Sequence, residues 1–260
     1  MIEFMSDHDA RPPILFLHGL FSNPALMTDW IEFMESAGYT CHTPALPGHQ
    51  PADLAVLRRI TLSDYVNHAL AAYDALDESP VVIGHSIGGL IAQHVAAVRN
   101  PRAMVLLASV PPGVLWPQLR SLPHLLPLMP SLLTGRPIRP SDATFRAIPL
   151  YGLADNEMSE IIGKFVPDSP HVFNSMSLGT RDTRVDRRAV SCPVLCVSGG
   201  ADRNVANWTS RRIARRYGAQ HHHHPGLPHW IVARSALHQV APPVLGWLDA
   251  TLADRSAVAG

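Results

Sequence analysis

The chain has 260 residues, of which 47% are hydrophobic and 16% are charged, so it can bury a sizeable core and a largely disordered chain is excluded. Lys plus Arg and Asp plus Glu both number 21, which argues against a basic nucleic-acid surface and a polybasic membrane patch. No apolar stretch is long enough to span a bilayer, and the polar start "MIEFMSDHDARPP" lacks the pattern of a signal peptide. The cysteines are odd in number and form no C-x-x-C pair, so we expect reduced thiols and a cytoplasmic protein.

Short apolar runs alternate with helical patterns in the first 110 residues. Strands are predicted over 14–18, 39–44, 81–85 and 103–109, and helices over 24–37, 62–77 and 87–99. A further edge strand is a possibility for "MIEFM" at residues 1–5. This alternation favours a parallel sheet that is covered by helices on both faces.

The alternation breaks over residues 111–187, which hold 11 of the 24 prolines. We interpret this segment as an inserted helical cap whose short helices are delimited by prolines. The pattern resumes with predicted strands at 194–199 and 219–224 and helices at 205–216 and 241–252, where Pro242 and Pro243 suit a first turn. Residues 1–110 and 188–260 would then form one α/β core, with 111–187 as its cap.

The pentapeptide "GHSIG" at residues 84–88 lies between a predicted strand and a predicted helix. It fits G-x-S-x-G, in which a sharp turn presents the serine and needs small residues, here Gly84 and Gly88, on either side. The helix that follows directs its free N–H groups toward the Ser86 oxygen. The simpler alternative is a glycine-rich turn with an incidental serine.

A serine hydroxyl needs a base, and the base needs an orienting acid. Of the 15 histidines, His229 follows the last predicted strand. Asp202 follows the strand at 194–199, and loops at this edge of a parallel sheet are where such folds place their chemistry. The chain order Ser86, Asp202, His229 is the order that the motif predicts. Asp29, Asp53 and Asp64 are alternatives for the acid only if Asp202 fails.

On these motifs the chain resembles the α/β-hydrolase superfamily, in the form of a serine esterase or lipase with a cap insertion. "FLHGLFSN" (16–23) resembles the family's HG loop, "ALPGHQ" (45–50) its P-G-H turn, and Gly199 to Val205 its G-x-x-D-x-x-V pattern around the acid. The residues around His229 depart mildly from the family's pattern, because Pro228 precedes the histidine. The resemblance implies an α/β-hydrolase fold with a mostly parallel sheet of about six to seven strands, its N-terminal strands reduced.

The same resemblance implies Ser86 as nucleophile, Asp202 as acid and His229 as base. The oxyanion hole is expected to use the backbone N–H of Ile87 and that of Leu20, with Phe21 as the less favoured choice. His18 is expected to organise its loop rather than act as a second base. The apolar cap suggests a hydrophobic pocket, with candidate lining residues Phe21, His85, Phe145, Tyr151 and Trp230, and further candidates Phe173 and Met176.

The expected activity is hydrolysis of carboxylic esters of a small-to-medium hydrophobic substrate through an acyl-enzyme. This chemistry needs no metal or organic cofactor. Thioesterase, lactonase, C–C bond hydrolase and acyltransferase activities with the same triad stay open. A ligand-binding protein or a cofactor-free dioxygenase on this fold is less favoured. Neither the oligomeric state nor the identity of the ester follows from the sequence. The run His221 to His224 is not expected to bind metal, since adjacent strand residues point to opposite faces.

Overall fold

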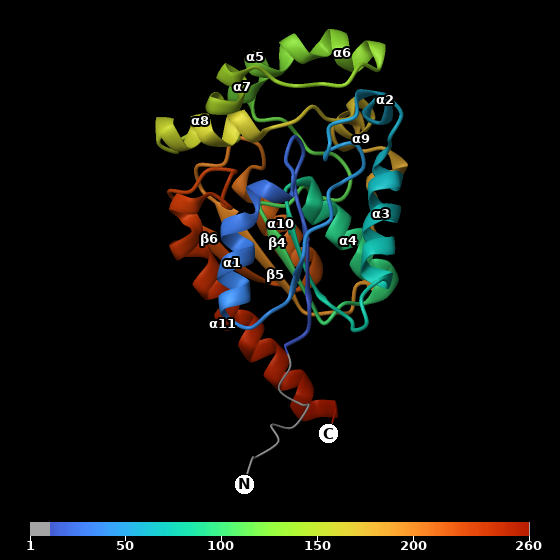
Figure 1. Cartoon of the computed structure of the whole chain (residues 1–260), viewed down its shortest axis with the longest axis vertical. Helices are drawn as coiled ribbons and strands as arrows, with labels where there is room; N and C mark the ends of the chain where they lie inside the picture. The colour runs from blue at the N-terminus through green and yellow to red at the C-terminus, as the bar shows by residue number, and fades with distance from the viewer. Residues whose placement is uncertain (1–10, 260) are drawn as a thin grey trace.

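Six parallel strands form one sheet in the computed structural model, which describes residues 11–259 (Figure 1). The strand order is β2-β1-β3-β4-β5-β6. The strands are β1 (Ile14–Leu17), β2 (Cys41–His42), β3 (Val81–His85), β4 (Ala103–Leu107), β5 (Val194–Gly199) and β6 (Gln220–His224). The expected α/β-hydrolase architecture is thereby confirmed, although β2 is shorter than predicted. The proposed edge strand over 1–5 lies outside the described residues.

Helices cover both faces of the sheet, and its central strands are mostly apolar and buried along their whole length. Ile14 and Phe16 pack on one face with Trp30 of α1 (Thr28–Ser36), beside α11 (Arg234–Ala259). Leu15 and Leu17 pack on the other face. That face is covered by α3 (Leu62–Asp74), α4 (Ile87–Arg99) and α10 (Asn207–Tyr217). Successive side chains of β1 thus point to opposite faces of the sheet and pack into two separate cores.

The last helix begins earlier than predicted and runs through both prolines. Its apolar side chains recur every fourth residue and are fully buried: Ala236, Val240, Val244 and Leu248. Burial of each larger side chain stabilises the helix by roughly 1.5–3 kcal/mol, which offsets the lost N–H groups of Pro242 and Pro243. Placing these prolines in a first turn was therefore wrong.

A series of short helices lies between β4 and β5 and sits above the carboxyl ends of the strands (Figure 1). They are α5 (Leu122–Leu125), α6 (Met129–Thr134), α7 (Asp142–Ala147), α8 (Asp155–Lys164) and α9 (Pro170–Leu178). Pro123, Pro130 and Pro170 occupy first-turn positions of α5, α6 and α9, where a missing N–H costs nothing. The rest of the described helical structure comprises α2 (Leu54–Leu57) and the short 3₁₀ turns Pro24–Leu26, Leu119–Ser121, Leu126–Leu128, Arg181–Thr183 and Arg187–Ala189.

The strand order reverses beside β1, because β2 pairs on one side of it and β3 on the other. The loops after β1 and β3 therefore leave the sheet in a crevice at the carboxyl ends of the strands, where α/β folds bind ligands. The two motifs singled out in the sequence, the HG loop and the serine turn, occupy this crevice. None of the helices in the described part of the chain is both long enough and apolar enough to cross a membrane.

Candidate active site

Ser86 lies at the apex of a tight turn between β3 and α4. Its φ of 55° and ψ of −119° fall in a region that costs a non-glycine residue of order 1–3 kcal/mol. The turn is possible because its neighbours are glycines. A Cβ atom placed on Gly84 would lie 2.3 Å from the Gly88 oxygen, and one on Gly88 would lie 2.1 Å from the Leu17 oxygen. Both are fixed backbone atoms, so the turn accepts no side chain at either position.

We expect Gly88→Ala to lower the free energy of unfolding by roughly 3 kcal/mol, since its methyl group overlaps backbone that cannot move aside. Chemical denaturation measures this change. Gly246→Ala is the matched control, because Gly246 lies in α11 with open space around its Cβ position. That variant should be neutral or slightly stabilising. Equal stability of the two variants would contradict this account of the turn.

Ser86, His229 and Asp202 form a continuous hydrogen-bonded line. The His229 Nε2 atom lies 2.9 Å from the Ser86 Oγ, and its Nδ1 atom lies 2.8 Å from the Asp202 Oδ2. All three residues are buried. The other Asp202 oxygen accepts the amides of Asn204 and Val205 at 2.7 and 2.8 Å, which fixes the carboxylate in its turn. A proton on Nδ1 facing the carboxylate leaves Nε2 free to accept the serine proton.

The two candidate amides of the oxyanion hole are distinguished by their hydrogen bonds. The Phe21 N–H donates to the Asp168 carboxylate at 2.7 Å. The N–H groups of Leu20 and Ile87 have no acceptor among residues 11–259, and Ile87 is the first residue of α4. Leu20, Phe21 and Ser86 all border the same cavity. The amide of Leu20 is therefore the better candidate of the two in the HG loop.

Two further histidines near Ser86, His18 and His85, are fully buried. The His85 Nε2–H donates to the His229 carbonyl at 3.1 Å, and burial together with the nearby His229 lowers the pKa of His85 to about 3. His18 bridges two loops, because its Nδ1–H donates to the Gly19 carbonyl at 3.0 Å and its Nε2 accepts the Leu46 amide at 3.1 Å. Burial and the adjacent His49 lower the pKa of His18 to about 3.

We expect these two histidines to make the protein less stable in acid. Their pKa values are about 3 when folded and about 6.5 when unfolded, so between these pH values the unfolded chain binds more protons. The free energy of unfolding should therefore fall from pH 6.5 toward pH 3, by roughly 1.4 kcal/mol per pH unit for each histidine. Urea denaturation across this range tests the slope. His85→Gln keeps an N–H donor but does not titrate, so an unchanged slope in that variant would contradict the explanation.

An apolar cavity of about 370 Å³ opens above Ser86 and His229. Phe21, His85, Phe145 and Trp230 line it, as do Phe173 and Met176. Tyr151, expected among them, does not: the residue is 42% exposed, and its ring lies against the Arg203 guanidinium. Residues that the sequence did not single out also line the cavity, among them Leu115, Leu125, Leu128, Leu132, Ile148 and Phe165. The apolar composition of the insertion indicated such a lining without specifying its members.

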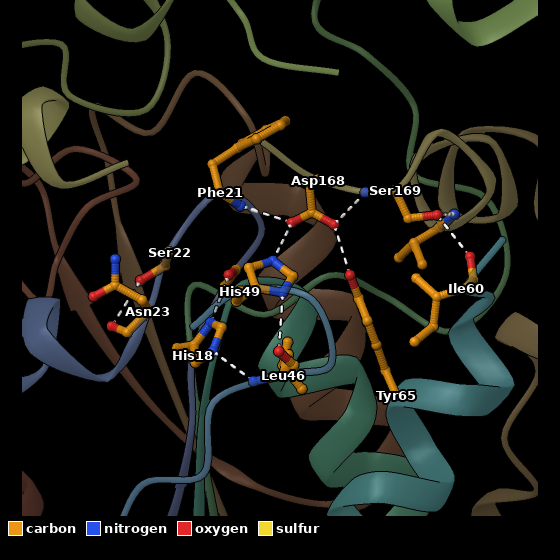
Figure 2. Close-up of polar contacts among 12 residues, drawn as sticks. His18, Phe21, Ser22, Asn23, Leu46, His49, Ile60, Tyr65, Asp168 and Ser169 are labelled. Carbon is orange, nitrogen blue, oxygen red and sulfur yellow. Dashed lines mark hydrogen bonds and ion pairs between the residues drawn. The ribbon is translucent and has the colours of Figure 1, made fainter. Parts of the chain in front are cut away.

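Sequence reasoning missed a polar cluster behind the HG loop. Asp168 is fully buried and accepts hydrogen bonds from Phe21, His49, Tyr65 and Ser169 (Figure 2). Its signal in the sequence is weak, since one carboxylate in a proline-rich segment resembles a surface charge.

The histidine run lies along β6, at the edge of the sheet. The rings of His221 and His223 both reach the Ser198 hydroxyl, at 2.8 and 3.1 Å. Among residues 11–259, no group of three or more His, Cys, Asp or Glu side chains is arranged to hold a metal ion.

A serine in a tight G-x-S-x-G turn after β3, with Asp202 and His229 in later loops below a series of short helices, is the arrangement typical of α/β hydrolases. Comparison with known families agrees, since the family model described as "Alpha/beta hydrolase family" matches residues 14–242. The chain belongs to this family.

Individual relatives are more distant. A pyrethroid hydrolase from Sphingobium wenxiniae is 26% identical over 218 residues, which cover 78% of this chain and 76% of that protein. A carboxylesterase structure from the thaumarchaeon Nitrososphaera gargenis superposes with a TM-score of 0.72 at 17% identity, covering 95% of this chain and 93% of the other. The structure of a hydrolase from Oleispira antarctica superposes with a TM-score of 0.72 at 16% identity, covering 92% of this chain and 91% of the other. These structural similarities establish the fold.

Proposed function

We propose that this protein is a serine hydrolase that cleaves carboxylic esters of small-to-medium hydrophobic substrates. The observation that carries the proposal is the hydrogen-bonded line from Asp202 through His229 to Ser86, which ends at an apolar cavity. Arg203 is the only Lys, Arg, Asp or Glu residue among the described residues lining that cavity, which disfavours a multiply charged substrate. The similarity to a pyrethroid hydrolase supports a hydrophobic ester as the substrate class.

Acylation begins when the Ser86 Oγ attacks the ester carbonyl and its proton passes to the His229 Nε2. The carbonyl electron pair moves to oxygen, and this oxyanion is bound by the N–H groups of Leu20 and Ile87. Each such donor lowers the barrier by roughly 3–4 kcal/mol. Asp202 holds the imidazole in its Nδ1–H tautomer and stabilises the positive charge that forms on it.

The tetrahedral intermediate then collapses. The C–O bond to the alcohol breaks, His229 donates its proton to the departing oxygen, and the acyl group remains on Ser86. Water enters, gives one proton to His229 and attacks the acyl carbon through a second tetrahedral intermediate. Release of the acid returns the proton to the Ser86 oxygen and completes the cycle.

Hydrolysis of p-nitrophenyl esters from acetate to palmitate tests this function. We expect the highest kcat/KM at short to medium acyl chains, because a cavity of about 370 Å³ lies at the small end of the roughly 300–1,000 Å³ range of ligand pockets. A fluorophosphonate should add once to the protein, at Ser86, as measured by mass spectrometry of the labelled peptide. No hydrolysis of any ester together with no labelling at Ser86 would overturn the proposal.

A further inference from the structure

The backbone of Phe21, in the HG loop, is held at both ends by one short segment of the insertion. Its N–H donates to the Asp168 Oδ2 at 2.7 Å, and its carbonyl accepts the Val166 N–H at 2.9 Å. Phe21 has a φ of +62°, a left-handed conformation that is unfavourable for an aromatic residue. Just beyond it, the Asn23 side chain donates to the Lys164 carbonyl at 2.8 Å. The loop conformation therefore depends on contacts from outside the loop.

Asp168 is itself firmly placed. It lies between α8 and α9, and its backbone exchanges two hydrogen bonds with Ile138, at 2.8 and 2.9 Å. Its side chain is fully buried and points from the insertion into the core, where Oδ1 accepts the Tyr65 hydroxyl and the Ser169 amide (Figure 2). All four hydrogen-bonding partners of the carboxylate are donors, so an ionised acid suits the position.

The partner of Asp168 in the P-G-H turn is His49. The His49 Nε2 atom lies 2.9 Å from Oδ2, and its Nδ1 atom faces the carbonyls of Leu46 and Pro47 at 3.2 and 3.3 Å. Both ring nitrogens thus face acceptors, as an imidazolium requires. Burial lowers the pKa of His49, but the charge and hydrogen bond of Asp168 outweigh it and the pKa is raised. Burial likewise raises the pKa of Asp168, and His49 with the two amides reverses this to a net lowering.

We propose that Asp168 is a positioning residue for the oxyanion hole, because it fixes the Phe21 amide and so leaves the preceding amide, that of Leu20, available to the substrate oxygen. The proposal rests on the ester-hydrolase function proposed above. An ionised acceptor makes the bond to Phe21 stronger than a neutral one would. Packing of the helical segment against the core is thereby coupled to formation of the oxyanion hole, since the Asp168 carboxylate takes part in both.

Asp168→Ala tests the proposal. With a p-nitrophenyl butyrate substrate, kcat should fall roughly 10- to 100-fold while KM changes less than about threefold, because the lost interaction acts on the transition state. Affinity for an alkyl trifluoromethyl ketone, whose adduct with Ser86 carries an oxyanion, should fall in parallel. Affinity for the matching alkyl methyl ketone, which forms no stable adduct with Ser86, should change much less. Asp168→Asn retains one carbonyl oxygen for the Phe21 amide and should restore part of kcat.

Tyr65→Phe is the matched control, because it removes a hydrogen bond from the same carboxylate but on Oδ1, the oxygen that does not contact Phe21. It should lower stability and leave kcat within about twofold. Equal losses of kcat in Tyr65→Phe and Asp168→Ala would overturn the proposal, since they would indicate a general structural effect.

Replacement of the Phe21 amide by an ester, with 3-phenyllactic acid at position 21, removes only the N–H group and does not depend on Asp168→Ala folding. It should lower kcat about tenfold. Unchanged kcat in this variant would overturn the role of Asp168 while leaving the hydrolase function intact, provided that wild type is active and Ser86→Ala is not. Ester hydrolysis that survives in Ser86→Ala would overturn both.

Discussion

Ser86→Ala should lower kcat for ester hydrolysis by roughly 10⁴-fold or more. The substitution removes one oxygen, and with it the atom that lies 2.9 Å from the His229 Nε2 and would become bonded to the acyl carbon. Alanine fits the turn as well as serine does, so the strained backbone and the packing of β3 against α4 are retained. Initial rates with p-nitrophenyl butyrate, together with thermal unfolding of both proteins, measure the effect and exclude loss of folding.

Ser198→Ala provides a control within the same chain. Ser198 is also a buried serine that is hydrogen-bonded to a histidine, with its Oγ 2.8 Å from the His221 Nε2, but it lies on β5 and does not line the cavity. Its removal should leave kcat within about twofold and leave fluorophosphonate labelling unchanged. Comparable activity in Ser86→Ala and wild type would show that Ser86 is not the nucleophile of this protein.

The parallel sheet followed from local sequence, because short, mostly apolar runs alternate with helical patterns before residue 110 and again after residue 188. The three residues of the hydrogen-bonded line could also be predicted, since each lies in a loop after a predicted strand and such loops meet at one sheet edge. The distances between their side chains could not be predicted from the sequence. What the sequence supplied was the placement of Ser86, Asp202 and His229 at the same edge, and the structure adds that they are within hydrogen-bond reach.

The errors arose where tertiary contacts outweigh local preference. Pro242 and Pro243 suggested a helix start, yet a stripe of buried side chains with four-residue spacing continues through them. Tyr151 suggested a pocket residue by its chemistry, but it lies against Arg203 outside the cavity. Asp168 was overlooked because its bond to Phe21 spans 147 residues and no periodic pattern in the insertion indicates which side chain points inward.

Asp202→Asn should lower kcat by roughly 10⁴-fold although it changes a single group. In the protein, Oδ1 accepts two backbone amides and Oδ2 faces the His229 Nδ1. An asparagine must keep its oxygen on the two amides, since its NH₂ group cannot accept them, so the NH₂ group is directed at Nδ1. Nδ1 must then accept, and the ring proton moves to Nε2. An Nε2–H facing Ser86 cannot take the serine proton, so the base is present in the wrong tautomer.

Asp53→Asn is the matched control, because the Asp53 Oδ1 also accepts two amides of the following turn, at 2.9 and 3.1 Å, but no histidine partner is found for it among residues 11–259. It should change kcat less than twofold. Rates for both variants between pH 6 and 9, with p-nitrophenyl butyrate, separate the tautomer explanation from a loss of charge alone. Asp202→Ala leaves His229 free to adopt either tautomer. If the wrong tautomer is the cause, Asp202→Ala should retain more activity than Asp202→Asn, and the reverse order would contradict it.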